Sequence, residues 1–179
     1  MLAADQTVLV IIDAQERLLR VMPDQEQFKK QLAKLIAGAQ ILHIPALYTE
    51  QAPDKIGATS EDIAVLLPGV RPVVKKSFSC AGADDFLKEL KSLRRKHVLI
   101  AGVEAHVCVY QTVSDLTGKG YNVQVVADCV ASRRDHDRQI ALERMRGAGA
   151  VLTTVEMVLC ELLKTADSQH FKPIMQLIQ

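Results

Sequence analysis

Short apolar runs alternate along the chain with longer stretches whose apolar residues recur at helical spacing. The run TVLVIID at 7–13 is apolar up to its closing carboxylate, which is typical of a central parallel strand buried on both faces. The same reasoning predicts further strands at 45–50, 71–76, 97–102, 121–128 and 150–154. Helical periodicity is present at 24–43, 84–93, 105–118, 134–146 and 155–164, and a last amphipathic stretch carries Phe171, Ile174, Met175 and Ile178.

This alternation predicts an α/β fold with three α-β-α layers built around a six-stranded parallel sheet. At 179 residues the chain is long enough for one sizeable core, so we expect a single domain over residues 1–179. The polar stretch QAPDKIGATSED (51–62) is predicted to be a loop. Two residue pairs have the spacing of helix-capping boxes, Asp24 with Gln27 and Thr153 with Glu156.

Charged residues are nearly balanced, with 22 Lys and Arg against 21 Asp and Glu and a formal net charge of +1. A field this weak does not favour nucleic acid or a membrane surface as a partner. The longest apolar run, TVLVII, is too short to span a bilayer. The first residues, MLAADQTV, lack the basic and apolar regions of a secretory signal, so we expect a cytoplasmic protein.

Reactive side chains follow several of the predicted strands. In open parallel sheets, ligands bind beyond the carboxyl ends of the strands, where the winding reverses. Those positions carry Asp13, Glu50, Lys75 with Lys76, the segment from Gly102 to Cys108, and Asp128. An acid, an amine and a thiol are the parts of a nucleophilic site. Each alone has an ordinary structural role, as a cap, a solvated lysine or a core thiol, but their convergence on one crevice favours a site.

Cys108 is predicted to lie in the first turn of the helix after the fourth strand. Free N–H groups and the helix dipole would favour its thiolate there, and a neighbouring lysine would lower its pKa further. The same N–H groups could hold the oxyanion of a tetrahedral intermediate. The other cysteines, Cys80, Cys129 and Cys160, are expected to be small buried hydrophobic residues.

Other chemistries lack their motifs. No C-x-x-C pair occurs, and no further ligands accompany His106 and Cys108, so we expect no metal. The chain contains neither G-x-G-x-x-G nor G-x-x-x-x-G-K-[ST], so we expect no nucleotide cofactor. A phosphatase loop would need an arginine where Cys108 is followed by Ser114 and Cys129 by Asp135.

Three segments resemble the isochorismatase-like cysteine hydrolases: VIIDAQERLL around Asp13, VVKKSFS around Lys75, and AGVEAHVCVYQTVSDLTGKGYNVQVVADCVASR around Cys108. The similarity begins near residue 7, and GVEAHVC is most like the isochorismatase domain-containing subgroup. The resemblance implies the strand order 3-2-1-4-5-6 and a catalytic triad of Asp13, Lys75 and Cys108. Asp13 would accept the thiol proton, and Lys75 would orient Asp13. Relatives commonly form dimers or larger assemblies, so a homo-oligomer is expected.

The resemblance also implies a cis peptide bond between Val103 and Glu104, with the N–H groups of Glu104 and Cys108 forming an oxyanion hole. Nicotinamidases of this family bind a metal through an Asp and two histidines after the second strand, whereas residues 48–62 here contain no histidine. The enzyme that gives the family its name lacks the nucleophilic cysteine and cleaves a vinyl ether. The presence of Cys108 therefore favours attack at a carbonyl carbon.

We therefore expect a metal-independent cysteine hydrolase that cleaves a C–N bond of a small amide-type substrate through a thioester. Four residues near the strand ends are assigned to its pocket: Gln15, Glu50, Gln51 and Phe78. The alternative is a catalytically weak family member that acts as an interaction or regulatory protein. A third reading is a redox-active Cys108, although no resolving cysteine is near it in the sequence.

Overall fold

The computed structural model describes residues 1–179 and contains a six-stranded parallel sheet in the order β3-β2-β1-β4-β5-β6. The predicted fold class and strand order are confirmed. The strands are β1 (Thr7–Ile12), β2 (Ala46–Gln51), β3 (Val73–Lys75), β4 (His97–Val103), β5 (Asn122–Ala131) and β6 (Val151–Thr153). The winding reverses at β1, which pairs with β2 on one side and β4 on the other. A crevice is therefore expected beyond the carboxyl ends of β1 and β4.

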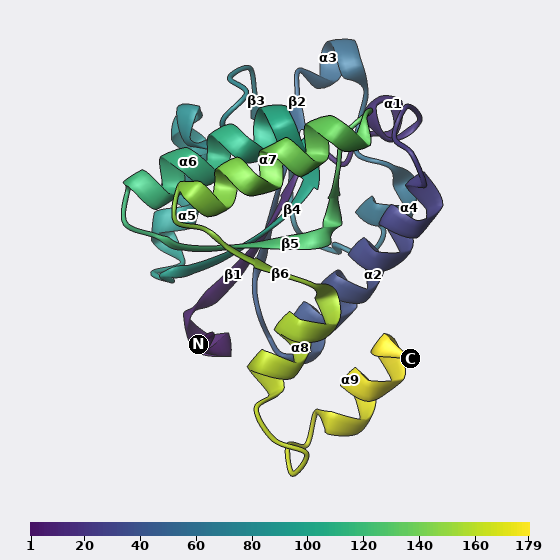
Figure 1. The fold of residues 1–179 in the computed structure, drawn as a ribbon, viewed down its shortest axis with the longest axis vertical. Helices are drawn as coiled ribbons and strands as arrows, with labels where there is room; N and C mark the ends of the chain where they lie inside the picture. Colours follow the sequence, from purple (N-terminus) through teal and green to yellow (C-terminus); the bar gives the residue numbers. More distant parts are fainter.

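Helices cover both faces of this sheet (Figure 1). One face packs against α2 (Gln25–Ile41), α8 (Val155–Leu163) and α9 (Phe171–Ile178). The other face packs against α5 (Asp84–Ser92), α6 (Tyr110–Gly118) and α7 (Asp135–Gly147). The three expected layers are present.

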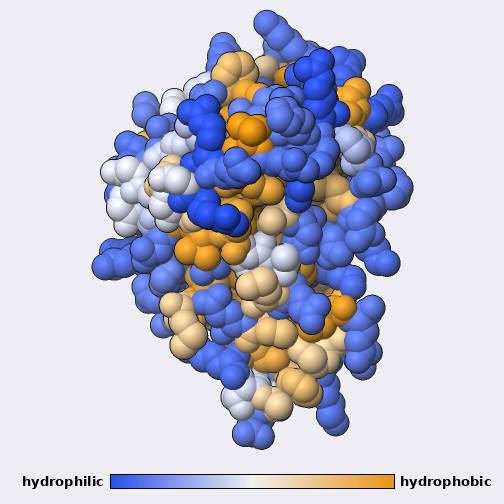
Figure 2. Space-filling model, viewed as in Figure 1, coloured by the Kyte–Doolittle hydropathy of each residue, from blue (hydrophilic) through white to orange (hydrophobic).

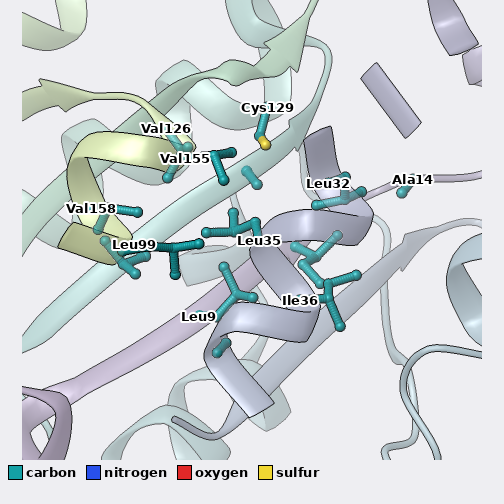
Figure 3. Packing of buried hydrophobic residues seen from close by; sticks show 14 of the residues in the cluster. Leu9, Ala14, Leu32, Leu35, Ile36, Leu99, Val126, Cys129, Val155 and Val158 are labelled. Carbon is teal, nitrogen blue, oxygen red and sulfur yellow. The ribbon is translucent and has the colours of Figure 1, made fainter. Parts of the chain in front are cut away.

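The apolar run of β1 is explained by these two layers. Leu9 and Ile11 belong to the cluster shared with α2 and α8, which also contains Leu35 and Val158; Leu9, Leu35 and Val158 are labelled in Figure 3. Val8, Val10 and Ile12 point into the opposite cluster, with residues of α5, α6 and α7. Since successive side chains of a strand face opposite ways, a strand buried on both sides must be apolar at every position.

The last helix is part of the core. Ile174 of α9 has no exposed surface and belongs to the cluster built on α2 and α8. Hydrophilic side chains cover much of the face shown in Figure 2, with smaller apolar areas between them. None of the helices combines the length and the apolar character needed to cross a membrane.

Several one-turn helices were not predicted. The segment expected to be a loop at 51–62 contains α3 (Pro53–Ile56) and the start of α4 (Glu61–Ala64). Another single turn, α1 (Glu16–Leu19), follows β1 directly. Elements this short contain too few residues for an apolar period to develop, so the pattern could not reveal them.

Neither predicted capping box is present. Asp24 stands at the N-cap of α2 but has φ 49°, in the left-handed region, and its side chain makes no capping bond. The α8 cap is Thr154 rather than Thr153, and its hydroxyl accepts the Met157 N–H at 3.3 Å. Thr153 is buried at the end of β6 instead.

Asp128 does not end its strand, contrary to the prediction. The register between β4 and β5 shifts between Ile100 and Gly102, and β5 continues to Ala131. The Asp128 carboxylate accepts the backbone N–H of Val155 at 3.0 and 3.2 Å. Burial raises the pKa of this carboxyl group. Its contact is therefore with the first turn of α8, not with the other reactive side chains.

Candidate active site

The carboxyl ends of β1 and β3 bring Asp13 and Lys75 into direct contact. The Lys75 Nζ donates a hydrogen bond to Asp13 Oδ2 at 2.7 Å, and neither side chain is exposed. Asp13 directly follows β1 with φ 50°, whereas Lys75 is the last residue of β3. An ion pair removed from water in this way is costly to break, because one charge would remain buried alone.

Three further oxygens surround the Lys75 ammonium. Gln51 Oε1 accepts a hydrogen bond from Nζ at 2.7 Å, and the carbonyls of Phe78 and Ser77 accept at 3.0 and 3.3 Å. Gln51 was predicted near the pocket, and its amide contacts the lysine directly. An ammonium has only three protons to donate, so this set satisfies it fully in its charged form.

The second oxygen of Asp13 is held by Thr49, a residue that sequence reasoning missed. Thr49 Oγ1 donates to Asp13 Oδ1 at 2.7 Å, and the same hydroxyl accepts the Asp13 N–H at 3.3 Å. Thr49 and Gln51 are two positions apart on β2, so their side chains leave the same face of the strand. This alternation was the only signal that pointed to Thr49.

Cys108 lies between β4 and α6, but not in an α-helical turn as predicted. It belongs to the π-helical segment η3 (Ala105–Val109), in which the Val109 N–H reaches back to the Glu104 carbonyl at 3.2 Å. Cys108 is 7% exposed, so its thiol is largely sheltered from solvent. The wider π turn interrupts the regular hydrogen bonding of the α-helix that was predicted for this segment.

The prediction of a low thiol pKa is wrong for the resting protein. Burial, together with the charge of the Asp13 carboxylate and its side-chain hydrogen bond, raises the pKa of Cys108 to about 12. Lys75 acts in the predicted direction, but its effect is smaller than that of burial. Loss of water stabilises the neutral thiol more than the nearby ammonium stabilises the thiolate.

The segment before Cys108 contains one feature that the resemblance implies. The peptide bond between Val103 and Glu104 is cis. The Glu104 carboxylate accepts two hydrogen bonds from Arg133, from the backbone N–H and from Nε, each at 3.1 Å. His106 Nδ1 lies 2.9 Å from Ser132 Oγ. Ser132 and Arg133, which follow β5, therefore support this segment from one side.

The other residues assigned to the pocket have different surroundings. Gln15 is buried and bonds to the Gln51 backbone, at 2.8 Å to its N–H and 3.1 Å to its carbonyl. Glu50 faces away from Lys75 and accepts the Thr59 N–H and hydroxyl at 2.7 and 2.8 Å. Phe78 contributes its carbonyl to Lys75, although the residue as a whole is 54% exposed.

The remaining cysteines divide into two groups. Cys80 and Cys129 are buried, as predicted, but Cys160 on α8 is exposed, so its predicted burial is wrong. Cys80 lies beside Thr49, the residue that holds Asp13, with Sγ 3.8 Å from Thr49 Oγ1. Its place directly after the lysine segment, in KKSFSC, is the only sequence signal that could have suggested this.

The parallel sheet in the order 3-2-1-4-5-6 and its helical layers place the protein in the isochorismatase-like α/β class. The Isochorismatase domain family model matches residues 7–157, and the chain belongs to this family. It is 34% identical to isochorismatase domain-containing protein 2A of Mus musculus over 98% of this chain and 84% of the mouse protein.

Two solved structures are similar over nearly the whole chain. The MAR1 ribonuclease structure from Caenorhabditis elegans has a TM-score of 0.93 and 34% identity, covering 99% of this chain and 91% of that one. YcaC from Pseudomonas aeruginosa, solved with hexane-2,5-diol and covalent acrylamide, has a TM-score of 0.92 and 26% identity, covering 98% and 90%. Membership of the family supports a hydrolase function.

Proposed function

We propose that the protein is a metal-independent cysteine hydrolase that cleaves the C–N bond of a small amide through a thioester at Cys108. The observation that carries this proposal is the position of the Asp13 carboxylate. One of its oxygens pairs with Lys75 at 2.7 Å, and the carboxylate also acts on the Cys108 thiol. A nucleophile, a base and a residue that orients the base are thus adjacent.

In the proposed reaction, Asp13 accepts the thiol proton while Cys108 Sγ attacks the carbonyl carbon. A C–S bond forms, and the carbonyl oxygen becomes an oxyanion held by the backbone N–H groups of Glu104 and Cys108. The C–N bond then breaks, and the leaving nitrogen takes the proton from Asp13. Water next attacks the thioester, with Asp13 as its base, and releases the acid and the free thiol.

The raised pKa of Cys108 gives Asp13 and Lys75 distinct parts in this scheme. Since the resting thiol is protonated, its proton must leave during attack, and Asp13 is the carboxylate positioned to receive it. Lys75 and Thr49 hold the two carboxylate oxygens at 2.7 Å each, so the base has one fixed orientation. Lys75 is therefore proposed as a positioning residue.

A structural relative supports a reactive group in this fold. The YcaC structure from Pseudomonas aeruginosa contains covalent acrylamide, which is a small primary amide with an electrophilic alkene. We infer that the thiol of the present chain is open to molecules of similar size and chemistry.

Ammonia release from a panel of small primary amides tests the proposal. We expect release by the wild type, with loss of at least a hundredfold in Cys108→Ala and Asp13→Asn. Cys160→Ala is the matched control, because it removes an exposed thiol on α8 and is expected to retain wild-type rates. Ammonia release that survives Cys108→Ala would contradict a thioester at this residue. Partner capture that is unaffected by Cys108→Ala, without turnover, would support the regulatory alternative.

RNA cleavage is a second candidate, because the Caenorhabditis elegans relative is a ribonuclease by name. One surface feature favours contact with an anionic chain. Lys91, Lys96 and Lys119 line a hollow of about 360 Å³ beside Tyr121, and none of the three forms an ion pair. This hollow lies at the amino ends of β4 and β5. Asp13 lies at the other end of the sheet, beyond the carboxyl end of β1. Incubation with labelled RNA measures whether the protein cleaves it. The same incubation with Cys108→Ala shows whether any cleavage depends on this thiol.

A further inference from the structure

A second thiol lies in the active site and has no part in the proposed hydrolysis. Cys80 begins the short turn η2 (Cys80–Gly82), which follows the Lys75 segment, and it has no exposed surface. It belongs to the same apolar cluster as Cys108. Two cysteines that are far apart in the sequence are therefore brought into one buried region.

A single hydroxyl joins the backbones of these two cysteines. Thr112 Oγ1 accepts the Cys80 N–H at 2.9 Å and donates to the Cys108 carbonyl at 2.7 Å. The distance between the Cys80 nitrogen and the Cys108 carbonyl oxygen therefore cannot exceed the sum of these two hydrogen-bond lengths. Thr112 is completely buried on α6, so the link is held by the core.

The side chains of the two cysteines share the same charged neighbours. The pKa of each thiol is raised by the Asp13 charge and lowered by the Lys75 charge, and the Cys80 thiol itself contributes to raising the pKa of Cys108. Interactions of this kind require proximity. Both thiols therefore lie within electrostatic range of the same ion pair, and Cys80 Sγ is 3.8 Å from Thr49 Oγ1, which bonds to Asp13.

We propose that Cys80 is the resolving cysteine for Cys108, and that a hydroperoxide converts the two thiols into a reversible disulfide. Asp13 accepts the Cys108 thiol proton as the sulfur attacks one peroxide oxygen, the O–O bond breaks, and the other oxygen takes that proton and leaves as an alcohol or water. Cys108 is now a sulfenic acid. Cys80 Sγ then attacks the Cys108 sulfur, an S–S bond forms, and the hydroxyl leaves as water.

The structure also contains a route for the Cys80 proton. The Cys80 thiol donates to Thr49 Oγ1 at 3.8 Å, and Thr49 Oγ1 donates to Asp13 Oδ1 at 2.7 Å. A proton can pass along this line from Cys80 to the carboxylate once Cys108 has been oxidised. Asp13 would thereby serve both cysteines, with Thr49 between it and the second one.

The disulfide would stop hydrolysis and protect the nucleophile. A sulfenic acid left alone is oxidised further to sulfinic acid, which is not reversed by ordinary thiols, whereas a disulfide is. The inference shares Cys108 with the proposed function but does not depend on amide cleavage. Oxidation can therefore be tested without a substrate.

Peroxide treatment followed by intact-mass and peptide analysis tests this proposal. In the wild type we expect loss of two hydrogen atoms, a peptide cross-link between Cys80 and Cys108, and full reversal by dithiothreitol. In Cys80→Ala we expect the sulfenic acid to persist, to be trapped by dimedone, and to gain further oxygen. Cys129→Ala is the matched control, because Cys129 is equally buried but lies in the other apolar cluster. It is expected to behave as the wild type.

Thr49→Val tests the proton route from Cys80 to Asp13 while both cysteines are retained. It removes the hydroxyl between Cys80 and Asp13, so dimedone-trappable sulfenic acid is expected to accumulate before the disulfide forms. The proposal is overturned if wild-type Cys108 is trapped by dimedone as fully as in Cys80→Ala, or if the cross-link joins other cysteines. Amide turnover without the cross-link would remove this inference alone. A cross-link without turnover would remove only the proposed hydrolase.

Discussion

Lys75 Nζ lies 2.7 Å from Asp13 Oδ2, and neither side chain has any contact with solvent. The pair joins β3 to β1 across the intervening strand β2, which supplies Thr49 and Gln51 as further partners. The four side chains form one connected polar group at the carboxyl ends of three neighbouring strands. The stability of the fold and the chemistry of the site are therefore coupled at this point.

Removal of Lys75 alone should destabilise the protein strongly. Lys75→Met leaves the Asp13 charge buried without its partner, and we expect the free energy of unfolding to fall by about 3–5 kcal/mol. The double variant Asp13→Asn, Lys75→Met removes both charges and should be more stable than Lys75→Met alone. Urea unfolding of the two single variants and the double variant measures this coupling. Strictly additive changes would show that the ion pair contributes nothing.

Alkylation of Cys108 should report its raised pKa. With the pKa of the thiol at about 12, labelling by iodoacetamide is expected to rise about tenfold per pH unit between pH 7 and 10. Asp13→Asn should speed labelling, because the Asp13 charge raises this pKa, whereas Lys75→Met should slow it. Asp13→Asn should nevertheless abolish turnover. A labelling rate that is already constant below pH 7 would contradict a protonated resting thiol.

Gly102 should not tolerate any side chain. Its φ is +124°, and a Cβ atom there would lie 2.0 Å from the Ile12 carbonyl oxygen, next to Asp13. We expect Gly102→Ala to lower the free energy of unfolding by more than about 3 kcal/mol, since backbone cannot yield as a flexible side chain can. Gly118→Ala is the matched control, because nothing lies within 4 Å of that Cβ. It should be neutral or slightly stabilising in thermal unfolding.

The free energy of unfolding should fall as the pH rises above about 9. Burial raises the pKa of Cys80 to about 11 and of Cys108 to about 12, and it raises that of Cys129 as well. These thiols remain protonated in the folded protein at a pH where they ionise in the unfolded chain. Each therefore removes up to about 1.4 kcal/mol per pH unit in that range.

Urea unfolding between pH 7 and 10.5 measures this slope. Cys129→Ala lies outside the site and should have a shallower alkaline slope than the wild type. Near pH 7 the two proteins should have equal slopes, because these thiols, with an ordinary pKa of about 8.5, remain protonated in both states there. Equal slopes above pH 9 would show that Cys129 does not contribute.

The strand pattern and the motifs determined most of the architecture in advance. A strand such as 7–13 can be apolar throughout only if both of its faces are covered, so the parallel sheet and its two helical layers followed from local composition. The strand ends alone already placed Asp13, Lys75 and Cys108 at one crevice. The strand order and the roles in a triad came from the resemblance, and the same order is present in the structure. One-turn elements such as α3 are too short to show a periodic pattern of apolar residues, so they could not be predicted.

Tertiary structure alone decided the electrostatics of the site. The pKa of Cys108 depends on how much water is excluded and on the distances to Asp13, Lys75 and Cys80, which come from separate segments. Sequence reasoning included the helix dipole and the lysine but could not weigh them against burial, so it predicted the wrong direction. The position of Cys80 beside Thr49, and the hydrogen bond from Thr49 to Asp13, could not be predicted for the same reason. Sequence determines which groups are available, whereas packing determines their distances and dielectric surroundings, and the energy of buried charges depends on both.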